Sequence, residues 1–262
     1  MLPCTKSDET TSSMAADEAF LDHCIEYRVA STQTEREAAF RLLYKAYRRA
    51  ELAVPSRHGI RVTPYHLLPT TNVFVARYGC NVISTVTLVE DGRLGLPMEE
   101  IYGQEIAELR QRGLYLAEVT SLADRRRDLH RFLPVFTRLS RLLVQFARNQ
   151  RVDRLLIAVH PRHMRFYQTY MAFEPIAAER DYPSVQNQPA VAMSLDLKGI
   201  ESRRPACYST FFGLAIPDQQ LLPHPIPARE QAYFRRFVDN QGRRTRCTLP
   251  PPSDPGRPIR ST

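Results

Sequence analysis

Several patterns that mark particular classes of protein are missing from this sequence of 262 residues. Its five cysteines are scattered and none is spaced as Cys-x-x-Cys, which argues against a zinc site or a disulfide framework and favours reduced thiols. No apolar run approaches the roughly 20 residues of a membrane-spanning helix. The first twenty residues lack the basic start and apolar stretch of a signal peptide. These absences predict a cytoplasmic protein without a structural metal.

What the chain does have is an excess of positive charge, with 36 Lys and Arg against 28 Asp and Glu and a formal net charge of +8. A basic chain favours anionic partners such as nucleic acid, a membrane surface or an acidic protein. Charge alone does not choose among them. The apolar fraction of 43% is ordinary for a globular protein and predicts a sizeable core.

Composition divides the chain into four parts. Residues 1–22 are polar and residues 240–262 are basic and rich in proline, so we expect both ends to lack fixed structure. Residues 23–200 are expected to form the main domain. Residues 201–239 carry apolar clusters, which predicts that this segment packs on the domain, either lining a pocket or covering a helix.

Signals for helices and strands alternate within the domain. Thr34 and Glu37 predict a capping box for the first helix, and Gly79-Cys80 predicts a hairpin turn. Proline in the first turn predicts one long helix over 134–149 and a shorter one from Pro161. The order of helix, hairpin, short helices, strand, long helix, strand, helix and strand predicts a mixed α/β sheet with helices on its faces.

Four motifs occur in an order that resembles one enzyme family. They are "RVTPYHLLPTTNVFVA", "GLPMEEIY", "LAEVTSLA" and "VHPRHMRFYQ". Over residues 26–197 the sequence is similar to the long-chain N-acyl amino acid synthases (FeeM-like), cousins of the acyl-homoserine lactone autoinducer synthases. The resemblance implies a Gcn5-related N-acetyltransferase (GNAT) fold. It also implies transfer of a fatty acyl group from acyl carrier protein to the amine of an amino acid.

One stretch departs from the pattern of ordinary GNAT enzymes. Those enzymes bind coenzyme A through a glycine-containing turn after the fourth strand, whose N–H groups close on the pyrophosphate. The corresponding residues 120–134 contain no glycine, and Cβ atoms throughout a turn obstruct such a cradle. The sequence therefore favours acyl-phosphopantetheine on acyl carrier protein as the donor, with no tightly bound cofactor. We expect the arm to lie between the 114–122 and 154–159 strands, like an added strand.

Arginines crowd the same turn and the helix that follows it. By default they form a solvated face, but they are also placed to meet the acidic helix of a carrier protein. An RNA-binding interpretation is weaker, because no aromatic platform accompanies them. The candidate docking residues are Arg125, Arg126, Arg127, Arg131 and Arg138.

Two residues are candidates for catalysis. Glu118 shares a strand face with apolar residues, so it is either a half-buried carboxylate satisfied by an arginine or a base whose raised pKa lets it manage the amine proton. Tyr167 lies where GNAT enzymes often keep a tyrosine that protonates the departing thiolate, and it also fits a core position. His160 and His163 have an i, i+3 spacing, but no third metal ligand is evident.

Two rival interpretations stay open. One is an autoinducer synthase that uses S-adenosylmethionine, and the other is a non-catalytic module that binds a carrier protein or nucleic acid. The leading interpretation has acyl carrier protein, an amino acid and a fatty acyl group as partners and no nucleic acid. It leaves a transient membrane contact for product release open.

Overall fold

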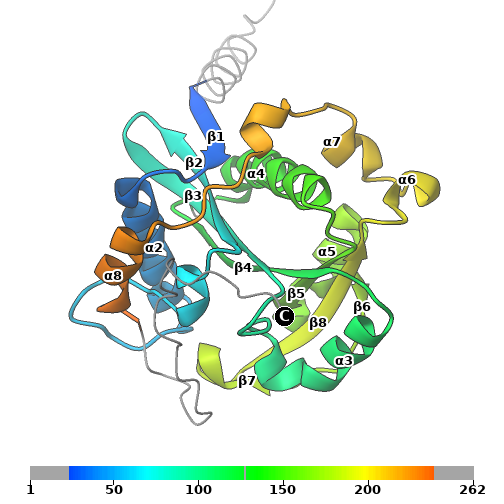
Figure 1. The fold of residues 1–262 in the computed structure, drawn as a ribbon, viewed down its shortest axis with the longest axis horizontal. Coiled ribbons are helices and arrows are strands. Elements are labelled where there is room, and N and C mark those ends of the chain that lie inside the picture. The colour runs from blue at the N-terminus through cyan, green and yellow to red at the C-terminus, as the bar shows by residue number, and fades with distance from the viewer. Residues whose placement is uncertain (1–23, 127, 239–262) are drawn as a thin grey trace, which may run out of the picture.

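A mixed eight-stranded sheet forms the centre of the molecule in the computed structural model, which describes residues 24–126 and 128–238 (Figure 1). The strands are β1 Ile25–Val29, β2 Thr71–Tyr78, β3 Asn81–Glu90, β4 Leu116–Asp124, β5 Arg154–Val159, β6 Glu174–Pro175, β7 Arg180–Tyr182 and β8 Gln188–Asp196. They run in the order β1-β2-β3-β4-β5-β8-β6, with β7 paired to β8. β4 and β5 are parallel, and the other pairs are antiparallel. This is the GNAT-like α/β sheet expected from the sequence.

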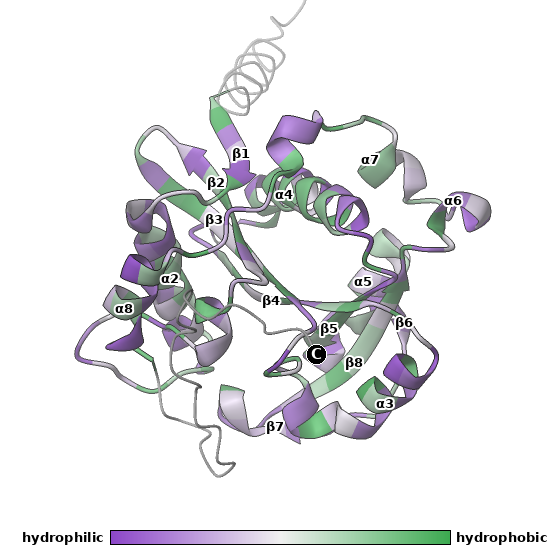
Figure 2. Ribbon diagram, viewed as in Figure 1, coloured by the Kyte–Doolittle hydropathy of each residue, from purple (hydrophilic) through white to green (hydrophobic). Residues whose placement is uncertain are grey.

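Helices cover both faces of the sheet. They are α2 Gln33–Arg49, α3 Glu99–Gln111, α4 Leu129–Asn149, α5 Pro161–Met171, α6 Ile200–Arg203, α7 Tyr208–Phe212 and α8 Ala228–Arg235. Short 3-10 turns are η1 Pro64–Leu67, η2 Pro183–Val185 and η3 Asp218–Leu221. The largest apolar cluster joins α4 to one face of the sheet, and a second joins α3 to the other face. Figure 2 shows hydrophobic and hydrophilic residues alternating around α2 and α4, as expected for helices with one face on a core. None of the described helices is long and apolar enough to cross a membrane.

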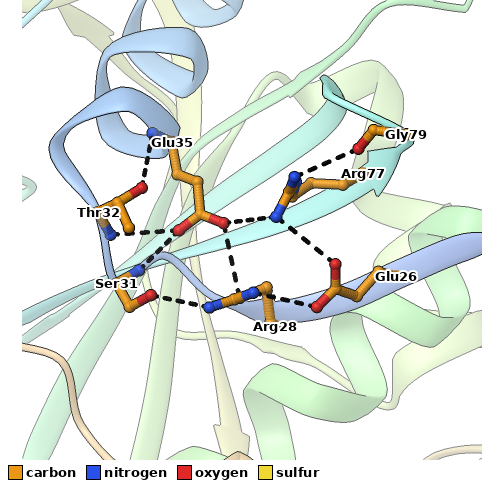
Figure 3. A network of polar contacts seen from close by, with 7 residues as sticks. All are labelled: Glu26, Arg28, Ser31, Thr32, Glu35, Arg77 and Gly79. Carbon is orange, nitrogen blue, oxygen red and sulfur yellow. Dashed lines mark hydrogen bonds and ion pairs between the residues drawn. The ribbon is translucent and has the colours of Figure 1, made fainter.

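Glu35 fastens the start of α2 to the first two strands (Figure 3). Its N–H donates to the Thr32 hydroxyl at 3.3 Å, and its carboxylate accepts the Thr32 N–H at 3.2 Å. The carboxylate also pairs with Arg77 at 2.9 Å and with Arg28 at 3.6 Å. The capping box predicted at Thr34 is therefore wrong by two residues, because these arginines select Thr32 as the cap.

Helix α4 begins earlier than its proline predicts. The Asp128 side chain accepts the His130 N–H at 2.9 Å and caps a helix that starts at Leu129, so Pro134 lies inside it. A proline there gives up one backbone hydrogen bond. The buried face of α4 on the sheet keeps the helix continuous, and its start lies next to the end of β4.

Residues 200–238 wrap around the domain from α4 to α2 (Figure 1). The Gln145 side chain of α4 donates to the carbonyl oxygens of Phe211 and Leu214, at 2.8 Å each. At the other end, the ring of Phe234 meets Phe40 of α2 edge to face, with 5.2 Å between ring centroids. The segment therefore covers helices on both sides of β1.

Candidate active site

A cavity occupies the opening between β4 and β5. The two strands pair only from Leu116–Arg154 to Glu118–Leu156 and then separate. Beyond that point, residues 119–122 and 157–160 line opposite walls of a cavity of about 450 Å³. Backbone groups on two parting strand edges have lost their ladder partners and can bond to a ligand instead. The parallel pair thus creates a slot in the middle of the sheet.

A bulge in β4 shapes one wall of this slot. Thr120 pairs with Thr87 and Ala123 pairs with Thr85, so Ser121 and Leu122 both lie opposite Val86. Ser121 has φ +57°, a left-handed conformation uncommon outside glycine. Bulges redirect strand edges and occur often beside active sites. Ser121 lines the cavity, and nothing in the surrounding sequence signals its conformation.

The cavity is apolar inside and polar at its rim. Its apolar lining from α4, α5 and the turn after α5 includes Phe136, Leu143, Val144, Met171 and Phe173. Its polar lining includes Tyr47, Glu51, His160, Arg162, His163 and Gln188. An arrangement of this kind suits a ligand with a long apolar part and a polar remainder.

Glu118 lies at the point where the strands separate, and its side chain is only 2% exposed. Its carboxylate accepts the N–H of Met98 at 2.7 Å, and no arginine pairs with it among the described residues. Burial raises the pKa of Glu118 to about 8, and the nearby charge of Glu99 adds to this rise while the Met98 bond opposes it. Glu118 therefore holds a proton that it can release near neutral pH.

Tyr47 lines the cavity and interacts electrostatically with Glu118. Glu118 itself is not one of the cavity-lining residues, whereas Tyr47 of α2 is. Burial raises the pKa of the Tyr47 phenol, Arg61 opposes the rise, and the charge of Glu118 adds to it. The sequence places Tyr47 on the apolar face of its helix and gives no signal of its place in the cavity wall.

Tyr167 stands on the α5 side of the same cavity. Its ring packs edge to face against Phe136 and Phe173, with centroids 6.4 Å and 6.0 Å away. Burial raises the pKa of Tyr167 to about 12, and Tyr47 adds to the rise, so the phenol stays protonated at neutral pH. Ala172, with φ +59°, ends α5 in the left-handed turn where a glycine is usual.

The candidate docking arginines occupy different environments. Arg125 and Arg131 are exposed, and no ion pair engages either one in the described part of the chain. Arg126 instead bonds to Asp124, with its backbone N–H at 2.7 Å and its Nε at 2.9 Å from Oδ1, and donates to the carbonyl of Arg131. Arg138 is half-buried on α4. Arg127 lies outside the described residues.

His160 and His163 lie together at the cavity rim, with ring centroids 6.3 Å apart. Within residues 24–126 and 128–238, no group of three potential ligands could hold a metal ion. The two histidines contact Arg162 instead, through their ring nitrogens.

Comparison with known proteins gives one family. The model of the family described as "N-acyl amino acid synthase FeeM" matches residues 38–196. The crystal structure of FeeM, an N-acyl amino acid synthase from uncultured soil microbes, is 28% identical, with a TM-score of 0.59 over 68% of this chain and 93% of that one. The acyl-homoserine lactone synthase LasI is 10% identical, with a TM-score of 0.53 over 74% of this chain and 96% of its own, a likeness of fold alone. A search of curated proteins gives no match.

The matched range includes β4, β5 and every residue that lines the cavity between them. It also includes Glu118, Tyr47 and Tyr167. The chain belongs to the FeeM family of N-acyl amino acid synthases, and it is an acyltransferase.

Proposed function

We propose that the protein transfers a long-chain acyl group from acyl carrier protein to the amine of an amino acid. The observation that carries this proposal is the slot between β4 and β5, which has apolar walls and a polar rim. A thioester placed at the separation point would lie beside the bulged strand edge. Its acyl chain would extend along Phe136, Leu143 and Met171. Burial of a long chain against such side chains stabilises the complex by about 0.8 kcal/mol per methylene group.

The turn after β4 supports a carrier-bound donor. Coenzyme A would require free backbone N–H groups at this turn to bind its pyrophosphate. Here the Arg126 N–H already donates to Asp124, and the Arg125 N–H donates to the carbonyl of Ile83 at 2.8 Å. Asp124 also places a carboxylate in this turn, and its negative charge disfavours a pyrophosphate there. The arm of a carrier protein carries a single phosphodiester and no nucleotide, so it requires fewer N–H groups from this turn than coenzyme A does.

The proposed reaction forms a C–N bond, breaks a C–S bond, and moves one proton off the amine and one onto the thiolate. The amine nitrogen attacks the thioester carbonyl carbon, and backbone N–H groups of β4 stabilise the negative charge on the carbonyl oxygen. In this proposal Glu118 takes the amine proton by way of the Tyr47 phenol, which lines the cavity and interacts with the charge of Glu118. The C–S bond then breaks, and the Tyr167 phenol protonates the departing thiolate. We place this reaction in the cytoplasm, where the thiols of Cys24, Cys80 and Cys207 stay reduced.

The test is an acyl-transfer assay with a matched pair of donors. Purified protein is given the same long acyl chain on acyl carrier protein or on coenzyme A, together with each of the common amino acids, and products are identified by mass spectrometry. We expect an N-acyl amino acid from the carrier-bound donor at a rate about tenfold or more above that from coenzyme A, because the turn opposes pyrophosphate binding. Comparable rates would contradict the choice of donor. A lactone formed from S-adenosylmethionine would assign the protein to the autoinducer synthases instead.

A further inference from the structure

A cationic side chain at the mouth of the cavity is held in place by its neighbours. The backbone N–H of Arg162 donates to His160 Nδ1 at 3.2 Å, and its Nε donates to His163 Nε2 at 3.0 Å. All three residues line the cavity, and Arg162 and His163 are exposed, which places them at its opening. The bond to His163 fixes the plane of the guanidinium. It leaves the two terminal nitrogens of Arg162 for another partner.

Several arginines in the described part of the chain pair with a carboxylate, and Arg162 does not. Arg110, Arg126 and Arg180, for example, each pair with a carboxylate. No carboxylate lies within ion-pair distance of Arg162 anywhere in residues 24–126 and 128–238. An arginine with two free terminal nitrogens presents the geometry that binds two oxygens of a phosphate.

We propose that Arg162 binds the phosphodiester of the donor's phosphopantetheine arm. This inference rests on the carrier-bound donor proposed above. The phosphodiester is the one charged group of that arm, and it joins the arm to a carrier that is too large to enter the cavity. When the thioester lies between β4 and β5, the phosphodiester must therefore stay at the opening. The positive end of the α5 dipole adds to the attraction.

The acidic residue that lines the cavity also favours binding of the phosphate at Arg162. Glu51, exposed just beyond the end of α2, is the acidic residue among those that line the cavity. Its negative charge disfavours a phosphate on the α2 side. His163 acts as a positioning residue, because it touches Arg162 through Nε and not through the nitrogens that would contact the phosphate.

The chain offers a matched control in Arg165. It lies three residues further along α5, is also exposed, and does not line the cavity. Arg162→Gln and Arg165→Gln therefore remove the same charge from the same helix. If positive charge anywhere on this helix attracts the carrier, the two variants should lose activity equally. If Arg162 binds the phosphodiester, only Arg162→Gln should lose activity.

The experiment uses three donors with one acyl chain: acyl carrier protein, acyl-phosphopantetheine and acyl-pantetheine, which lacks the phosphate. We expect Arg162→Gln to lower kcat/KM about 10- to 100-fold for the two phosphate-bearing donors, the loss expected for a charge-assisted contact. Its kcat/KM for acyl-pantetheine should stay within about twofold of wild type, as should every value for Arg165→Gln. Arg162→Lys should recover part of the loss because it restores the charge.

Three results would overturn the assignment: an equal loss with acyl-pantetheine, no loss with either phosphate-bearing donor, or an equal loss in Arg165→Gln. Thermal unfolding of each variant shows whether it is folded. If the wild-type enzyme does not transfer an acyl group from acyl carrier protein, the donor proposal is wrong. The ratio between acyl-phosphopantetheine and acyl-pantetheine needs no carrier, so it still decides the role of Arg162.

Discussion

At the scale of single residues, the unusual feature is a carboxyl group that is protonated at neutral pH. Glu118 is 2% exposed and has one hydrogen bond, from a backbone N–H, so its charged form is poorly stabilised. With a pKa of about 8, the group is mainly neutral at pH 7 and mainly charged at pH 9. A base must be in its charged form to accept a proton. The proposed mechanism therefore predicts a rate that rises with pH through about 8.

Glu118→Gln tests this assignment because it keeps the shape and cannot accept a proton. We expect single-turnover acyl transfer to fall about 100-fold or more, the usual contribution of general base catalysis. The wild-type inflection near pH 8 should disappear, and a higher pH should restore some of the rate by supplying more free amine. Carrier binding should not change. Wild-type rates at neutral pH in folded Glu118→Gln protein would assign Glu118 to the core.

The stability of the same variant gives an independent measurement. Because the pKa of Glu118 is higher in the folded state than its ordinary value of 4.5, the folded state binds the proton more tightly. The resulting stability is fully present below about pH 4.5 and is lost as pH rises to about 8. Glu118→Gln should remove this part of the pH dependence of unfolding, whether or not Glu118 is catalytic.

At the scale of helices and strands, the sequence predicts the elements better than their ends. The hairpin at Gly79-Cys80 and the helix from Pro161 are confirmed, because glycine and proline constrain the backbone locally. Thr32 and Thr34 both fit the sequence pattern of a capping box. The helix begins after Thr32 because Glu35 also pairs with the arginines of β1 and β2. No pattern in the sequence predicts the strand β1 or the bulge at Ser121, since pairing with distant strands determines both.

The same distinction applies to the candidate site. The family motifs place Glu118 and Tyr167 in the sequence, and the fold brings Tyr167 into the cavity wall and Glu118 to the point where β4 and β5 separate. The partnership of Arg126 with Asp124 has no sequence signal, because three consecutive arginines look equivalent along the chain. Only the folded turn distinguishes the bound arginine from the exposed Arg125.

The turn and the start of α4 give a prediction about carrier docking. The double change Arg125→Glu/Arg131→Glu reverses two exposed charges and leaves the bonded Arg126 in place. Exposed contacts contribute about 0.2–1 kcal/mol each, so two reversals should weaken carrier binding about 2- to 30-fold and reduce its salt dependence. Titration of labelled carrier protein at two salt concentrations measures both effects.

The control for docking reverses two exposed arginines elsewhere. Arg112 lies between α3 and the start of β4, whereas Arg125 and Arg131 lie beyond the end of β4. Arg229 lies on α8. Arg112→Glu/Arg229→Glu changes the net charge by the same amount. If the two double variants bind the carrier equally weakly, net charge and not a docking surface determines the affinity.

At the scale of the whole molecule, residues 200–238 hold together parts of the domain that the sheet alone does not join. Arg36 of α2 is 3% exposed and pairs with Glu230 of α8 at 2.7 Å. Its other terminal nitrogen donates to the carbonyl of His224 at 2.8 Å. In the described part of this segment, no residue lines the cavity between β4 and β5. Its contribution should therefore be to stability and not to turnover.

Glu230→Gln separates these two contributions, because it leaves Arg36 buried without a counter-charge. Removing one partner of a buried pair costs up to about 3–5 kcal/mol, and urea unfolding should show a loss approaching that range. The control is Glu201→Gln, which removes the same charge from an exposed pair with Arg148, whose side chains are 57% and 41% exposed. That change should cost less than about 1 kcal/mol. Acyl transfer per folded molecule should be unchanged in both variants.

Arg36→Met/Glu230→Met, which removes both charges, should recover much of the lost stability, since the cost arises from the unpaired charge. Equal small losses in Glu230→Gln and Glu201→Gln would mean that the ion pair does not fasten the segment, and the Phe40–Phe234 contact would then be the attachment to test.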